Sequence, residues 1–253
     1  MEWLNDFYSK QLQWSMKYTN FNMEDLMEEL ADKMESFSDF PPKKILELGG
    51  GNGQFSVTAA KRGYDVTMIE LTSVAVELTN KLAEKYKIGS NLRVIQGDFY
   101  EVELQDRFDV ICYWDGFGIG SDSDQQKLLE RIDDWLAPNG TVLMDIYTPW
   151  FWHKVAGQKK QFNKIHTKYD FDADACRMID TWWIKDDKEA KITQSLRCYS
   201  PADLRLLLKG TGLDLVHCEP GGAMDYDKWQ YKEQVPLNEA MTYLAKLKEI
   251  SDN

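Results

Sequence analysis

KKILELGGGNGQFS, residues Lys43–Ser56, is the stretch of this sequence that determines the expected fold. A short apolar run around Glu47 predicts a buried strand, and the glycines from Gly49 to Gly53 predict a tight turn. The residues after the turn have a helical pattern, so a helix should begin there with its free N–H groups facing the turn. This order of strand, glycine turn and helix is typical of domains that bind a nucleotide-type cofactor.

The spacing of the glycines separates two cofactor classes. The dinucleotide fingerprint G-x-G-x-x-G would need glycine at position 54, where this chain has Gln54. The pattern present is E-x-G-x-G-x-G, which resembles motif I of the class I S-adenosylmethionine-dependent methyltransferases. The alternatives are an NAD-dependent oxidoreductase and a glycine turn that binds no ligand. The resemblance implies that the cofactor contacts five residues of the motif: Glu47, Gly49, Gly50, Gly51 and Gly53.

Two further signals follow in order along the chain. The second strand is predicted to end on Glu70, whose carboxylate can accept hydrogen bonds from both ribose hydroxyls of either cofactor. The third strand, Leu92–Gln96, is followed by Gly97, Asp98 and Phe99. In the resembled family an acid at this place meets the adenine amino group and the next residue lines the ring. The resemblance implies that two more side chains complete the cofactor set: Leu71 and Trp114.

The segment after the fourth predicted strand, Phe108–Cys112, lies beside the reacting methyl group in the resembled family. It lacks the Pro-Pro-aromatic motif of enzymes that methylate nucleobase amines and the paired glutamates of protein-arginine enzymes. Residues 113–120 are instead similar to small-molecule and sugar methyltransferases. The expected products are a methylated small molecule and S-adenosylhomocysteine, with an N, O or C acceptor left open.

A sulfonium methyl group is already activated, so transfer mainly needs the acceptor held in line behind it. No nucleophilic triad is visible in the sequence. A general base is needed only for some acceptors, and the candidates are His153, Asp115 and Tyr113. Aromatic side chains outside the core are expected to contact the substrate: Tyr18, Trp150, Trp152 and Trp182.

The expected architecture is α/β, with a Rossmann-like, seven-stranded, doubly wound sheet and a small antiparallel β lid inserted after strand five (Thr141–Tyr147). Three strand-like runs predict the lid. A homodimer would use this lid or a C-terminal helix predicted over Leu237–Ile250. The predicted parts are an N-terminal helical cap (1–42), a cofactor-binding core (43–147), the lid (148–198), and the completion of the sheet with the C-terminal helix (199–253).

Composition restricts the other function classes. The net charge of −12 disfavours nucleic acid as a partner, and no apolar run approaches the ~20 residues of a membrane span. Four widely separated cysteines favour free thiols in a cytoplasmic protein over zinc or disulfides. Asp145 in strand five is not followed by a carboxylate cluster, so no metal is expected. A non-catalytic S-adenosylmethionine sensor is the alternative from another class.

Overall fold

A computed structural model describes residues 2–19, 22, 24–185, 187–226 and 228–250. Its main feature is a seven-stranded sheet made of β1 (Lys44–Leu48), β2 (Asp65–Glu70), β3 (Leu92–Gln96), β4 (Phe108–Tyr113), β5 (Leu136–Tyr147), β10 (Leu213–Pro220) and β13 (Thr242–Glu249). The strand order is β10-β13-β5-β4-β1-β2-β3, and only β13 runs antiparallel to its neighbours. This topology confirms the expected doubly wound α/β fold.

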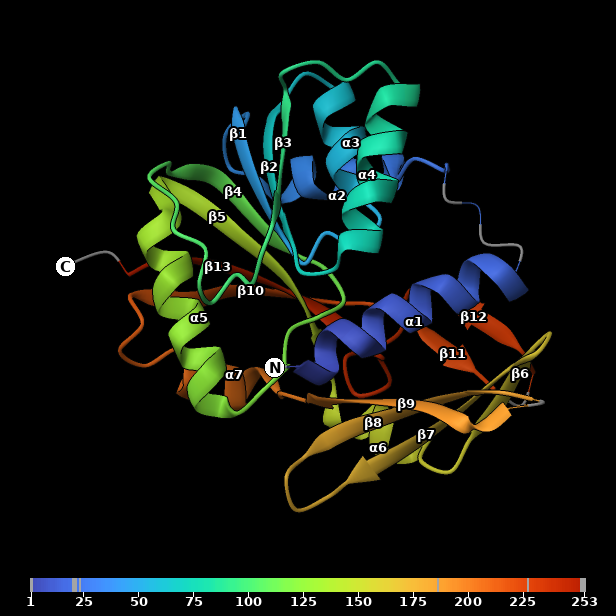
Figure 1. Cartoon of the computed structure of the whole chain (residues 1–253). Helices are drawn as coiled ribbons and strands as arrows, with labels where there is room; N and C mark the ends of the chain where they lie inside the picture. The colour runs from blue at the N-terminus through green and yellow to red at the C-terminus, as the bar shows by residue number, and fades with distance from the viewer. Residues whose placement is uncertain (1, 20–21, 23, 186, 227, 251–253) are drawn as a thin grey trace.

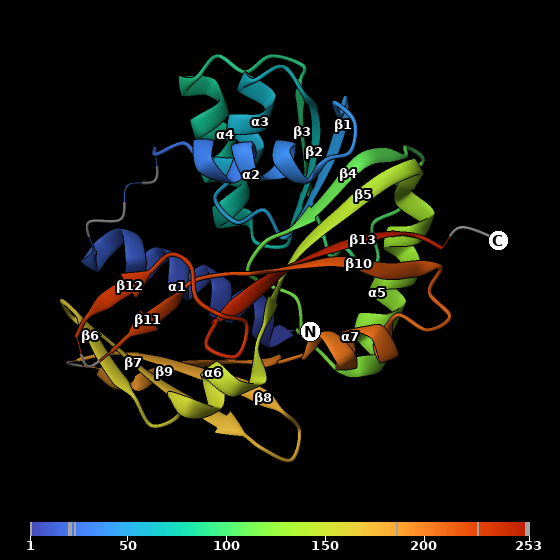
Figure 2. The same ribbon diagram turned by 180° about the vertical axis from the view of Figure 1, so that it is seen from behind.

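Helices cover both faces of the sheet (Figures 1 and 2). One face carries α2 (Glu28–Phe37), α3 (Gln54–Lys61) and α4 (Ser73–Lys85), and the other carries α5 (Asp122–Trp135) and α7 (Pro201–Leu207). A strand covered on both faces has to be apolar on both, and β1 accordingly buries four consecutive residues after Lys44. One of these is Glu47, so the sequence places a carboxylate inside the core.

The insertion after β5 confirms the expected antiparallel sheet, although it is larger than predicted. It contains β6 (Lys159–Phe162), β7 (Ile165–Asp172), β8 (Arg177–Ile184) and β9 (Asp187–Arg197), in that order. The aromatic run before it forms a helix, α6 (Pro149–Lys154), because Pro149 occupies the first helical position, where its missing N–H is not needed. A hairpin of β11 (Ala223–Asp225) and β12 (Gln230–Lys232) was not predicted.

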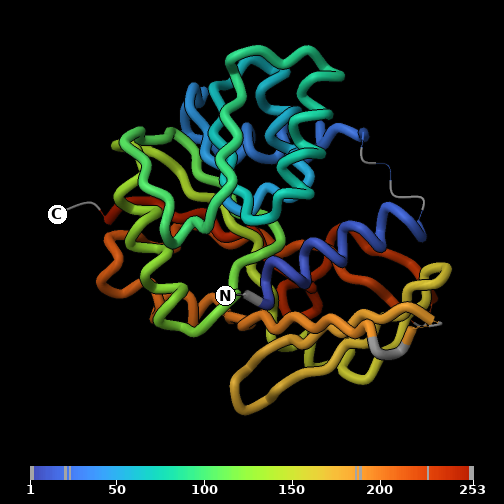
Figure 3. The backbone as a smooth tube through the Cα atoms, viewed as in Figure 1, coloured from blue at the N-terminus to red at the C-terminus, as the bar shows by residue number. Residues whose placement is uncertain are grey.

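The N-terminal segment forms one continuous helix, α1 (Glu2–Tyr18), which lies between the main sheet and the lid (Figure 3). It contacts β9 of the lid and α4 of the core. Phe7 is 1% exposed and Leu4 is also buried, so this helix is packed into the molecule along one side. Its other residues are therefore in a position to line the space between the two sheets.

The predicted C-terminal helix is wrong. Thr242–Glu249 forms β13, which pairs with β5 on one side and with β10 on the other. Its alanine, leucines and lysines favour a helix when the segment is considered alone. Backbone pairing with two strands and the burial of Tyr243 and Leu247 stabilise a strand instead. A dimer through a C-terminal helix is therefore excluded. Strand five also begins earlier than predicted, at Leu136.

Candidate active site

A cavity of about 560 Å³ lies at the carboxyl ends of β1 to β4. Residues of α1 close one side of it, and Trp182 of the lid closes another. A more open hollow of about 520 Å³ at the amino ends of the strands, around Tyr64 and Asn91, contains none of the predicted site residues. Ligands of open α/β sheets bind at the carboxyl ends of strands, so the first cavity is the candidate site.

The glycine turn between β1 and α3 forms the floor of this cavity. Gly51 and Gly53 have φ angles of +55° and +73°, which side chains with a Cβ rarely adopt. A Cβ on Gly53 would lie 2.3 Å from the Thr79 side chain, so glycine is needed for the turn to pack against α4. A Cβ on Gly51 would meet nothing within 4 Å. Gly51 therefore presents open backbone to a ligand.

Glu47 lies beneath this turn. Its side chain is 3% exposed and accepts a hydrogen bond from the Ser56 hydroxyl of α3. Burial raises the pKa of Glu47 to about 8, because the charged form loses its hydration. The motif acid is therefore neutral over much of the physiological pH range while the cavity holds no cation.

Glu70, at the end of β2, is 7% exposed, and its carboxylate is hydrogen-bonded to neighbouring residues. Its Oε1 accepts hydrogen bonds from the Thr72 N–H and hydroxyl, both at 2.8 Å, and its Oε2 accepts one from the Gly51 N–H at 2.9 Å. The Leu71 N–H also stabilises the charged carboxylate. Glu70 therefore has a structural role in the turn, and its ribose contact stays a prediction.

Asp98 and Phe99 follow β3 and line the same cavity, together with Leu71. The Asp98 carboxylate accepts a hydrogen bond from the Tyr100 N–H at 2.9 Å, which fixes the turn. The Phe99 ring packs edge-on against the Tyr113 ring at a centroid distance of 5.5 Å. The structure thus brings the predicted cofactor residues from three successive strands to one wall.

The end of β4 supplies the next part of the wall. Tyr113 is buried, and its hydroxyl donates a hydrogen bond to the Gly116 carbonyl at 2.9 Å. The Trp114 ring packs edge-on against Phe55 at 5.4 Å. Its indole N–H is buried and has no hydrogen-bond partner among the described residues. A buried donor without a partner is costly, so this atom is suited to a ligand oxygen in the cavity.

Asp115, a predicted base candidate, adopts the left-handed conformation with φ +54°. Its side chain is exposed to the cavity but enclosed by protein, and this desolvation raises its pKa. The Tyr147 hydroxyl of β5 donates a hydrogen bond to its carboxylate and partly opposes that shift. The bond also holds the carboxylate in place.

Other predicted acceptor residues do not line the cavity. His153 is exposed, and its ring lies 5.4 Å from that of Phe171. Helix α6 directs its aromatic side chains into the packing between the lid and β5 instead, and the Trp152 indole N–H donates to the Met241 carbonyl at 3.0 Å. Of the predicted substrate and catalytic residues, the structure places His153, Tyr18, Trp150 and Trp152 outside the cavity, whereas Trp182 lines it. Of the predicted cofactor residues, Gly53 is not part of the lining.

Sequence reasoning missed three residues near Asp115: Tyr8 of α1, and Asp145 and Tyr147 of β5. The signal for α1 was present, since Leu4, Tyr8, Gln11, Leu12 and Ser15 have helical spacing and all line the cavity. Asp145 was considered only as a metal ligand. Its burial raises its pKa to about 6.

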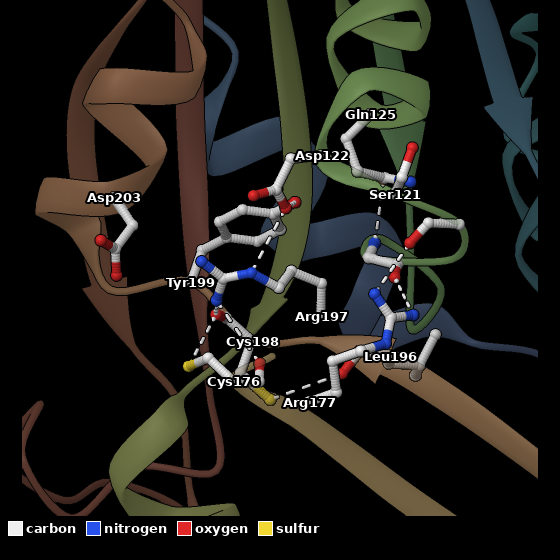
Figure 4. A network of polar contacts seen from close by, with 12 residues as sticks. Ser121, Asp122, Gln125, Cys176, Arg177, Leu196, Arg197, Cys198, Tyr199 and Asp203 are labelled. Atoms are coloured by element: carbon white, nitrogen blue, oxygen red, sulfur yellow. Dashed lines mark hydrogen bonds and ion pairs between the residues drawn. The ribbon is translucent and has the colours of Figure 1, made fainter. Parts of the chain in front are cut away.

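A hydrogen-bond network holds the loop after β4 against the lid (Figure 4). Arg177 of β8 donates to the Gly120 carbonyl at 2.8 Å and to the Gly118 carbonyl at 3.2 Å. The same guanidinium donates to the Ser195 carbonyl of β9 at 2.7 Å. Ile119 forms a β-bridge with Leu196 between these contacts. The loop that begins with Asp115 is therefore fixed to the lid sheet.

The structure also bears on metal binding and on membrane insertion. Within the described part of the chain, no group of three or more histidine, cysteine, aspartate or glutamate side chains is arranged to hold a metal ion. Every helix in that same part is too short or too polar to cross a bilayer.

Comparison with known proteins agrees with this geometry. The chain is 31% identical over 148 residues to protein arginine N-methyltransferase 8-B of Danio rerio, an alignment that covers 55% of this chain and 34% of that protein. The chain thus spans about a third of that relative's length. The expected alternatives, an NAD-dependent oxidoreductase and a sensor, find no support in these comparisons.

Solved structures share the fold. The CcbJ methyltransferase from Streptomyces caelestis superposes with a TM-score of 0.69 at 17% identity, covering 87% of this chain and 88% of that chain. The glycopeptide N-methyltransferase MtfA complexed with S-adenosylmethionine gives 0.56 at 16% identity, covering 87% of both chains. The sequence model of the methyltransferase domain family matches residues 7–218. The chain therefore belongs to the methyltransferase domain family and has the fold of the class I S-adenosylmethionine-dependent methyltransferases.

Proposed function

We propose that this protein transfers the methyl group of S-adenosylmethionine to a small-molecule acceptor. The observation that carries the proposal is one continuous cavity, which is lined at one end by predicted cofactor residues and at the other by Asp115 and Trp182. Its volume of about 560 Å³ lies in the usual range of small-molecule sites.

The residues present fit the cofactor. Gly51 leaves space for a ligand beside its backbone, the Glu70 carboxylate lines the cavity, and the Trp114 indole N–H has no partner among the described residues. Bound S-adenosylmethionine supplies a methyl group activated by its positive sulfur. Five acidic side chains line the cavity, and those that are charged favour such a cationic ligand: Glu47, Glu70, Asp98, Asp115 and Asp145.

A small molecule is favoured over a protein as acceptor because α1 and the lid enclose the cavity. Tyr8 of α1 hydrogen-bonds across it to Gln194 of β9 at 3.1 Å, so the two covering elements are joined over the site. An arginine side chain on a protein would need an open groove for the flanking chain. The loop after β4 also lacks the paired glutamates expected for arginine methylation.

The chain contributes to the reaction by orientation and by excluding water. Asp115, Trp182 and Tyr8 position the acceptor, and holding two reactants in line can lower a barrier by ~7–11 kcal/mol. Asp115 is the cavity residue placed to accept a proton from the acceptor where one has to leave. Since its side chain faces the cavity, it can do so without rearrangement of the loop.

Calorimetric titration tests the cofactor. Purified protein should bind S-adenosylhomocysteine and S-adenosylmethionine and should not bind NADH; the reverse result would overturn the proposal. Transfer of labelled methyl groups to acceptors in a cell extract tests catalysis, and it should persist in EDTA because no metal is expected. Tight binding without any transfer would favour the sensor.

A further inference from the structure

Acidic side chains line the cavity, and no basic side chain among its described residues balances those that are charged. No lysine, arginine or histidine is present among the described residues that line it. Of its five carboxylates, Asp115 and Asp145 are outside the predicted cofactor set. They lie at the ends of β4 and β5, on the side of the sheet away from β2 and β3. An acidic acceptor would be repelled here, and a cationic one would be attracted.

The groups around Asp115 add no positive charge. Those that act electrostatically on it or on its hydrogen-bonded partner are phenols and carboxylic acids: Tyr8 from α1, Tyr113 from β4, Asp145 and Tyr147 from β5, Tyr169 from β7, and Asp180 from β8. Two cations act on members of this group, and neither lines the cavity. Lys33 of α2 affects Asp145, and Lys160 of β6 affects Asp180 while its ammonium group donates to the Tyr169 hydroxyl at 3.0 Å.

A second observation comes from the lid. Asp180 is 5% exposed, and its Oδ2 accepts a hydrogen bond from the Trp182 indole at 2.7 Å. Its Oδ1 is buried and makes no hydrogen bond of good geometry with the residues that the structure describes, although the Gln194 side chain lies near enough to oppose the rise in the pKa of Asp180. Asp180 pairs across the strands with Gln194, which accepts the hydrogen bond from Tyr8. An incompletely satisfied carboxylate therefore lies behind the wall formed by Tyr8 and Trp182, and aromatic rings of this kind bind cations.

We propose that the acceptor is an amine that is protonated in solution, and that the Asp115 carboxylate binds its ammonium group and takes one proton from it. This inference rests on the proposed function. After the proton moves to Asp115, the nitrogen lone pair forms the N–C bond while the C–S bond breaks and its electron pair stays on sulfur. The product leaves as a methylated ammonium ion, and the proton on Asp115 passes to solvent. Tyr147 acts as a positioning residue through its hydrogen bond to Asp115.

The test pairs acceptors that differ only in the reacting group. Labelled S-adenosylmethionine is offered with alkyl and arylalkyl amines, each beside the alcohol and the carboxylic acid of the same carbon skeleton. We expect transfer to amines alone, and calorimetric binding of those amines to the complex of protein and S-adenosylhomocysteine. Transfer to an alcohol or acid whose matching amine is inert would overturn the proposal, as would the absence of amine binding at millimolar concentration.

Variants separate this inference from the proposed function. Asparagine tolerates a positive φ, so Asp115→Asn should keep the loop and the affinity for S-adenosylhomocysteine. It should lose amine binding and about 100-fold or more in amine turnover. Asp174→Asn, the same change on an exposed lid turn, is the matched control and should behave as wild type. Wild-type turnover by Asp115→Asn would contradict the role of Asp115, whereas failure of the unaltered protein to bind S-adenosylhomocysteine would contradict the proposed function itself.

Tyr147→Phe gives a readout that a structural role alone would not give. The hydroxyl hydrogen bond favours the charged carboxylate, so its loss should raise the pKa of Asp115. The acidic limb of the pH profile of kcat/KM for the amine should then move to higher pH, with the affinity for S-adenosylhomocysteine unchanged. An unmoved limb would overturn the positioning role of Tyr147.

Discussion

At the end of β2, Glu70 combines a structural and a binding role. Its carboxylate joins the glycine turn to the start of α4 through Gly51 and Thr72, and Glu70 also lines the cavity. Burial raises the pKa of this acid, and the donors that point at it oppose the shift. A substitution should therefore change both the stability of the protein and its affinity for the cofactor.

Glu70→Gln preserves the shape of the side chain but turns one acceptor oxygen into a donor. Facing the Gly51 N–H or the Thr72 N–H, that donor should cost ~1.5–3 kcal/mol of stability, measured by urea unfolding. The loss of charge should weaken the binding of S-adenosylhomocysteine by about tenfold or more in calorimetry. Glu84→Gln on the exposed side of α4 is the control and should change neither quantity. Unchanged affinity in Glu70→Gln would remove the ribose assignment.

The buried acids Glu47 and Asp145 predict how stability depends on pH. Burial raises the pKa of Glu47 from 4.5 to about 8 and that of Asp145 from 3.8 to about 6. A raised pKa means that the neutral form stabilises the fold fully below the unfolded-state pKa, and that this contribution is lost as the pH rises through the folded-state value. The unfolding free energy of the ligand-free protein should therefore fall between about pH 4 and pH 8.

Two isosteric variants separate the contributions of Glu47 and Asp145 to this pH dependence. Glu47→Gln should flatten the unfolding free energy up to about pH 8, whereas Asp145→Asn should flatten it only up to about pH 6. Urea unfolding at several pH values measures both slopes. Identical pH dependence in the wild type and both variants would show that neither acid is held neutral in the fold.

At the scale of elements, the contact between the lid and the loop after β4 sets the geometry of the acceptor side. Arg177 binds two carbonyls of that loop, and Ile119 pairs with Leu196 beside it. The sheet that covers the site and the loop that begins with Asp115 therefore act as one unit. The cofactor end, built on β1 to β3, does not include these contacts.

Arg177→Lys tests whether the lid contacts affect the acceptor side alone and leave the cofactor end unchanged. Lysine has one ammonium group in place of the planar guanidinium, so it cannot reach both loop carbonyls and Ser195 together. We expect kcat/KM for the acceptor to fall by about tenfold or more, mainly through KM, with the affinity for S-adenosylhomocysteine unchanged. Arg93→Lys on the exposed edge of β3 is the matched control. If the affinity for S-adenosylhomocysteine fell as much as kcat/KM for the acceptor, the lid would support the whole site.

The cofactor end could be predicted from the sequence because each signal is local. Glu47, Gly51 and Gly53 belong to one short motif. Glu70 is the last residue of β2, and Asp98 follows the end of β3. The acceptor side could not be predicted in the same way, because its residues come from α1, β4, β5 and β8, and only tertiary packing brings these elements together. His153 and Trp152 illustrate the limit, since an aromatic run next to the site folded into a helix that packs away from the cavity.

At the scale of the whole molecule, α1 occupies the space between the two sheets and closes the site (Figure 3). It contacts the lid through β9 and the core through α4. Tyr8 of this helix faces the cavity and bonds to Gln194. A ligand cannot be covered without α1, so its ordering should respond to ligand binding.

Hydrogen exchange tests the response of α1. Saturating S-adenosylhomocysteine should slow the exchange of the backbone amides of Glu2–Tyr18 by about tenfold or more, because opening of the helix then also costs binding free energy. The amides of α5, on the opposite face of the sheet, are the internal control and should change less. Equal protection of both helices would mean that the ligand stabilises the fold globally without α1 acting as a cover.

The position of β13 has a consequence for synthesis on the ribosome. This strand is the last of the described strands, yet it lies between β5 and β10, with Thr242 paired to Tyr147 and Leu213 paired to Glu249. Until it emerges, β5 has an open edge and β10 has no strand to pair with. An unpaired edge invites pairing with other chains, so the nascent protein is prone to aggregation from the synthesis of residue 147 to that of residue 249. The sheet can be completed only after translation has passed residue 249, and chaperones that shield strand edges should act before that point.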